Sequence, residues 1–185
     1  MTNIKNTSEL ILSRNKFDKF EVGILEALIK KAKTLRRENV TSIIPDRLTL
    51  RSDSIQKSLQ NVVLLFITEY LKDDQISDEE QGDIEYLKLL FKIEEGDFSK
   101  FKDIEVGINK LIEIQLLRMY ADKEIDDKEE QHKIRIQKIF SLGYDEFLGK
   151  AFKFEKKLIK EGIDPLKLDT FITKRIIDKI KNGIL

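Results

Sequence analysis

The chain has 185 residues, carries 34 basic and 34 acidic side chains, and contains no cysteine. The missing thiols exclude disulfides, thiolate zinc sites and cysteine nucleophiles. No apolar run approaches the length of a membrane span or resembles a signal peptide, so we expect a soluble, cytoplasmic protein. Only two prolines and eight glycines interrupt the sequence, a composition typical of helices joined by short loops.

The net charge of zero conceals an uneven distribution along the chain. Residues 1–68 hold 12 basic and 7 acidic side chains and residues 148–185 hold 10 and 5, so each end carries a charge of +5. Residues 69–107 carry −8 and residues 108–147 carry −2. Because a nucleic-acid-binding domain normally has a net positive charge, we expect no nucleic-acid partner. We favour another protein as the partner and leave peripheral membrane contact open.

Apolar residues at helical spacing predict a series of helices and no strand. The first dozen residues are polar, and we expect them to be loosely ordered. Helices are then predicted at 17–37, 53–70, 77–92, 104–120, 127–140, 144–160 and 165–183, with an ordered loop at 39–52. We therefore expect an all-α fold, a compact bundle of seven to eight helices. Its parts would be an N-terminal helix and loop (1–52), a core (53–160) and a C-terminal amphipathic helix (161–185).

The core is predicted to contain the same helix–loop–helix unit twice. A shift of 49 residues aligns the acidic segment 73–80 with 122–129 and continues to align apolar residues on both sides. Two such units can cover each other's apolar faces, as repeats do. The aligned apolar pairs are Leu59 with Ile108, Val63 with Ile112, Ile67 with Leu116, Tyr70 with Met119, Leu87 with Ile136, Leu90 with Ile139, Phe91 with Phe140, Ile93 with Leu142 and Phe98 with Phe147.

Each acidic segment ends in a pattern that has two chemical interpretations. Ser77 with Glu80, and Asp126 with Glu129, match the capping box, in which side chains at the start of a helix satisfy backbone N–H groups. We favour this interpretation. The alternative is a divalent-cation site, because Ca²⁺ and Mg²⁺ prefer oxygen ligands such as carboxylates.

The cation site would not be a calcium-binding EF-hand. That loop requires a glycine where this chain has Asp74 in the first segment and Lys123 in the second. A looser site, built from the two acidic segments together, stays the alternative.

The spacing of Asp73, Ile76, Ser77 and Glu80, followed by a helix of leucines and phenylalanine, resembles the tellurium-resistance TerB-like family. The resemblance covers roughly residues 55–160, and the chain departs from the family's pattern by lacking its glycine in both segments. It implies an all-helical fold with duplicated helix–loop–helix units, and a role in bacterial stress response or phage defence. It also implies divalent-metal binding by acidic residues. By position, these are Asp73, Glu80, Asp122 and Glu129.

Little else in the sequence points to catalysis. His132 is the only histidine and stands among charged neighbours, so we expect a solvated side chain. No glycine-rich phosphate loop is present, and paired carboxylates alone leave a carboxylate-dependent hydrolase as the weakest hypothesis. We therefore expect a non-enzymatic helical interaction module, for which a divalent cation is the only cofactor that the sequence suggests.

Overall fold

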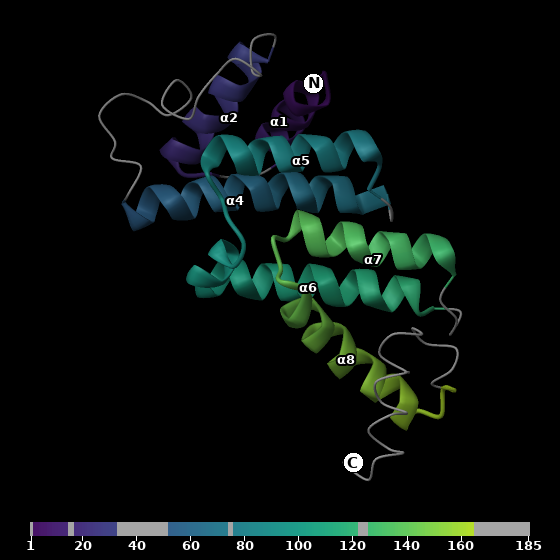
Figure 1. Ribbon diagram of the computed structural model, residues 1–185. Coiled ribbons are helices and arrows are strands. Elements are labelled where there is room, and N and C mark those ends of the chain that lie inside the picture. Colours follow the sequence, from purple (N-terminus) through teal and green to yellow (C-terminus); the bar gives the residue numbers. More distant parts are fainter. Residues whose placement is uncertain (1, 15–16, 33–51, 74–75, 122–125, 165–185) are drawn as a thin grey trace. The chain divides into compact units, whose positions relative to one another are not determined.

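A computed structural model describes residues 2–14, 17–32, 52–73, 76–121 and 126–164 of the chain (Figure 1). These residues form seven α-helices and two short 3₁₀-helices, and none of them lies in a strand, so the predicted all-α fold is confirmed. No helix in these ranges is long and apolar enough to cross a membrane. The chain divides into two compact units, Met1–Ile108 and Asn109–Leu185.

The first unit is organised around α4 (Asp53–Tyr70), which packs against α1 (Thr2–Arg14), α2 (Lys19–Lys31) and α5 (Asp78–Phe91). The α4 side chains Leu59, Val62, Val63, Phe66 and Ile67 are fully buried. Because α4 contacts all three other helices, it is the central helix of this unit, as its apolar sequence predicts. The unit also contains the 3₁₀-helices η2 (Leu71–Asp73) and η3 (Asp97–Lys100) and the first residues of α6 (Lys102–Met119).

The helix α1 shows that the expectation of a loosely ordered start was wrong. Ile4 and Ile11 are 1% and 2% exposed and lie two turns apart on one face, with Thr7 and Ser8 between them. The two small polar residues conceal this apolar face in the sequence. Ser8 can be buried because its hydroxyl donates to the carbonyl of Ile4 (2.8 Å), which leaves no unsatisfied donor.

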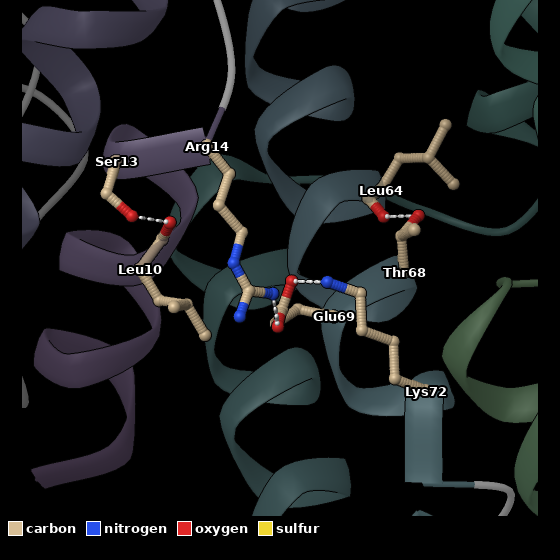
Figure 2. Close-up of polar contacts among 7 residues, drawn as sticks. All are labelled: Leu10, Ser13, Arg14, Leu64, Thr68, Glu69 and Lys72. Atoms are coloured by element: carbon tan, nitrogen blue, oxygen red, sulfur yellow. Dashed lines mark hydrogen bonds and ion pairs between the residues drawn. The ribbon is translucent and has the colours of Figure 1, made fainter.

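Polar contacts hold the C-terminal end of α1 against α4 (Figure 2). Arg14 Nη1 donates to Glu69 Oε1 (2.8 Å), and Lys72 Nζ donates to Glu69 Oε2 (2.5 Å). Ser13 and Thr68 donate their hydroxyls to backbone carbonyls of their own helices. The Arg14–Glu69 pair orients α1 on α4. Because both cations are half exposed, each ion pair contributes only about 0–1 kcal/mol.

Most predicted helix boundaries lie close to those of the structure. The helix predicted at 17–37 is α2, which begins after the N-cap Asp18, and the helix predicted from 53 begins after the N-cap Ser52. The part of the first prediction beyond residue 32, the loop 39–51 and the helix predicted at 165–183 lie outside the described residues.

The second unit consists of α6 from Asn109 onward, α7 (Asp127–Ile139) and α8 (Tyr144–Lys160). In α8, Phe147, Ala151 and Phe154 recur at helical spacing and are buried. The opposite side of α8 carries exposed lysines, so this helix separates an apolar face from a basic one.

The two aligned segments share structural features at the 49-residue shift. α4 and α6 both have 18 residues, and both members of each aligned apolar pair are buried. The chain leaves α5 and α7 through left-handed residues at equivalent positions, Lys92 (φ 55°) and Ser141 (φ 51°). At both turns the next backbone N–H donates to the carbonyl five residues earlier, as in a Schellman motif. An origin by duplication stays a prediction.

Candidate functional site

Glu80, one of the four proposed metal ligands, caps the start of α5. Its Oε2 accepts hydrogen bonds from the backbone N–H and the hydroxyl of Ser77 (2.9 and 2.7 Å). The Ser77 Oγ also accepts from the backbone N–H of Glu80 (3.3 Å), which completes the capping box.

Glu129 has the same role at the start of α7. Its Oε2 accepts from the backbone N–H of Asp126 (2.9 Å), while Asp126 Oδ1 accepts from the backbone N–H groups of Lys128 and Glu129 (2.9 and 2.8 Å). Carboxylates are favoured here because the N-terminal end of a helix carries partial positive charge. Both capping boxes predicted from the sequence are therefore present.

Of the four proposed ligands, Glu80 and Glu129 have described side chains. Asp73 lies in η2 but its side chain is not among those described, and Asp122 lies outside the described residues. Glu80 belongs to the first unit and Glu129 to the second. Within the described ranges, no group of three or more His, Cys, Asp or Glu side chains could hold a metal ion. Cation binding by these residues stays a prediction.

His132 is buried, so the expectation of a solvated side chain was wrong. The residue is 7% exposed, and its Nε2 lies 3.1 Å from Oε1 of Gln115 on α6. Burial, and to a lesser degree the charge of Arg135, lowers the pKa of the imidazole. The contact suits a neutral ring protonated at Nε2, because the amide oxygen can only accept. A signal was present, since Ile136 and Ile139 follow one and two turns later on the same face of α7.

A buried ionic cluster in the second unit was also missed. Lys133 Nζ lies 3.7 Å from Glu155 Oε1 and 5.2 Å from the centre of the Tyr120 ring. The Tyr120 hydroxyl donates to the same oxygen of Glu155, and the three residues are at most 3% exposed. The 49-residue shift aligns Lys133 with Ile84, which is buried. The alignment therefore indicated that Lys133 is buried as well. This cluster links α7 to α8.

The first unit buries a polar network of its own. The Tyr70 hydroxyl donates to Asp83 Oδ2 (3.1 Å) and accepts from Thr7 Oγ1 (3.4 Å). Burial raises the pKa of the Tyr70 phenol far above its ordinary value and also raises the pKa of the Asp83 carboxyl. A phenol that keeps its proton is a poor nucleophile, so this network joins α1, α4 and α5 without pointing to catalysis.

A groove of about 340 Å³ lies between α6 and α8 in the second unit. Its floor is apolar and consists of the buried side chains Ile112, Leu116 and Phe154. None of the described residues that line it is one of the four proposed metal ligands. The polar side chains that line it are Asn109, Glu113, Lys150, Lys153 and Lys157.

The three lysines stand at helical spacing along one rim of this groove. Lys150 is held in place, because its Nζ donates to Asn109 Oδ1 (2.6 Å) and lies 3.5 Å from Glu146 Oε1. Lys153 and Lys157 are exposed and form no ion pair with another described residue. The groove therefore places positive charge beside apolar surface. The sequence could not reveal it, because it exists only once α6 packs on α8.

Comparisons with models of protein families, with curated proteins and with solved structures find no match for this chain. The function therefore rests on the geometry of the described residues.

Proposed function

We propose that this protein is a non-enzymatic helical interaction module, and that it binds a protein partner in the groove between α6 and α8. The observation that carries the proposal is the apolar floor of Ile112, Leu116 and Phe154 beside the lysine row. The three floor side chains are at most 9% exposed, so most of the contact with a partner would come from the lysines and their apolar stems beside them. Charged residues at the rim increase the rate of encounter and select the partner.

The groove has the form that receives an amphipathic helix. Lys150 and Lys157 are two turns apart, about 10 Å along the axis of α8. An incoming helix can lay apolar residues on the floor and acidic residues along the lysines over that length. Among the described residues of the lining, Glu113 is the acidic one, and it favours a partner with mixed charges over a polyanion.

The capping boxes support a module without catalysis, because they give Glu80 and Glu129 a structural role. The TerB-like resemblance of residues 55–160 would place such a module in a bacterial stress-response or phage-defence system. That assignment is part of the proposal.

The proposal is tested by quantitative pull-down from cells with the variant Lys153→Glu/Lys157→Glu. The matched control is Lys156→Glu/Lys160→Glu, which reverses two exposed lysines of α8 that do not line the groove. We expect the groove variant to lose its specific partner while the control keeps it, with unchanged helical circular dichroism in both. Equal retention in the two variants would contradict the proposal.

A further inference from the structure

The helix α5 exposes an acidic stripe that ends in an apolar side chain. Asp78, Glu79 and Glu85 are exposed along it, and Leu89 follows one turn after Glu85. Leu89 is 77% exposed, more than any other large apolar side chain described. An exposed leucine alone is ordinary, but here it stands on the segment of the chain with the strongest negative charge, −8 over residues 69–107.

We propose that the groove between α6 and α8 binds this stripe of α5 from a second copy of the chain. The inference rests on the proposed function, because it takes the groove as the docking site and names its occupant. The two surfaces are complementary at one charged and one apolar position: Glu85 of α5 meets a lysine of the groove, and Leu89 meets its apolar floor.

The spacing of the two surfaces defines a register. A helix antiparallel to α8 that places Glu85 opposite Lys157 brings Leu89 level with Lys153 and Phe154, one turn or about 6 Å away. Leu89 then covers the ring of Phe154 at the floor of the groove. Lys92, exposed just beyond α5, lies level with Lys150 in the same register, one turn before Glu146.

The charge of the whole chain also favours a second copy as the occupant. Its basic and acidic residues are equal in number and its isoelectric point is about 6.7, so copies do not repel one another at neutral pH. A phosphate-rich surface would meet Glu113 at the rim of the groove and gain nothing from the apolar floor.

The test is sedimentation velocity of the full chain from about 5 to about 500 μM, a range that covers interfaces of modest affinity. We expect reversible self-association. Glu85→Lys and Lys157→Glu should each weaken it at least tenfold, as should Leu89→Ser. The double variant Glu85→Lys/Lys157→Glu, which exchanges the charges, should restore most of the affinity.

Two matched controls accompany these variants. Glu95→Lys and Lys160→Glu change exposed residues of the same charge outside the stripe and the groove, and they should leave self-association unchanged. An equal loss in the controls would overturn the proposal, because it would indicate a general charge effect.

Two further results would also overturn the proposal. One is a chain that stays monomeric over the whole range, and the other is an exchanged variant that is as weak as the single ones. If the chain is monomeric while Lys153→Glu/Lys157→Glu still loses a pulled-down protein, the groove binds a different acidic helix and only the second copy is wrong. If the chain is monomeric and Lys153→Glu/Lys157→Glu also keeps its partners, the proposed function is wrong as well.

Discussion

Replacing Glu155 by glutamine tests whether the buried cluster of the second unit is an ion pair that the fold needs. The substitution removes one charge and keeps an amide oxygen that can accept from Tyr120. Lys133, whose side chain is 4% exposed, keeps a second carboxylate, that of Glu130, at 3.6 Å. Because an uncompensated charge in a protein interior is poorly solvated, removing one partner of a buried pair typically costs about 3–5 kcal/mol.

Glu130 determines how much stability the substitution Glu155→Gln removes. Its side chain is 45% exposed, so water screens its attraction for Lys133 and it replaces Glu155 only in part. We therefore expect Glu155→Gln to cost about 3 kcal/mol. For a chain of this length, such a loss lowers the melting temperature by about 6–12 °C.

The assay is thermal and urea unfolding, followed by circular dichroism, of the wild type, Glu155→Gln and Lys133→Met/Glu155→Gln. The double variant removes both charges and keeps the acceptor for Tyr120, so it should recover most of the lost stability. A cost of less than about 1 kcal/mol for Glu155→Gln, or a double variant less stable than the single one, would show that the fold does not need this ion pair.

Three further outcomes are expected. Burial raises the pKa of Asp83 above its ordinary value of 3.8, so the stability gained from its protonated form is complete below pH 3.8 and is lost as pH rises through the folded pKa. Between pH 3.8 and the folded pKa, urea unfolding should show that the stability of Asp83→Asn declines less with rising pH than that of the wild type. An equal decline in the two proteins would contradict this prediction. Burial lowers the pKa of His132 below 6.5, so the wild type should lose stability as pH falls from 6.5 towards the folded pKa. His132→Gln should remove this acid-side loss, and an identical pH profile argues against a buried neutral ring. Because Glu80 and Glu129 serve as caps, chelator-treated protein titrated with Ca²⁺, Mg²⁺, Mn²⁺ or Zn²⁺ should show no ion-selective rise in melting temperature. A selective rise that Glu80→Gln/Glu129→Gln abolishes would instead favour the cation site.

The sequence allowed predictions where the interaction is local. The capping boxes of Ser77 with Glu80 and Asp126 with Glu129 depend on residues three apart, and the bounds of α8 follow from a long apolar period that ends at Gly162. Such features require no knowledge of which helices meet.

Features that depend on tertiary packing were missed. His132 and Lys133 look like solvent residues because their neighbours in sequence are charged, and their burial depends on partners 17 and 22 residues away, Gln115 and Glu155. In α1, Ser8 has the polarity of a surface residue and becomes a core residue through one hydrogen bond to its own helix. The groove forms only where α6 and α8 pack together. The basic charge of residues 148–185 therefore predicted a positively charged surface but not a groove.

Site-specific photo-crosslinking in cells tests the central claim, that the groove between α6 and α8 binds a protein. A photoreactive side chain is placed in turn at Lys153 and Lys157, which line the groove, and at Lys156 and Lys160, which do not. We expect one discrete crosslinked protein, a second copy of the chain or another partner, from positions 153 and 157 only. Equal crosslinking from all four positions, or none from the groove, would contradict it.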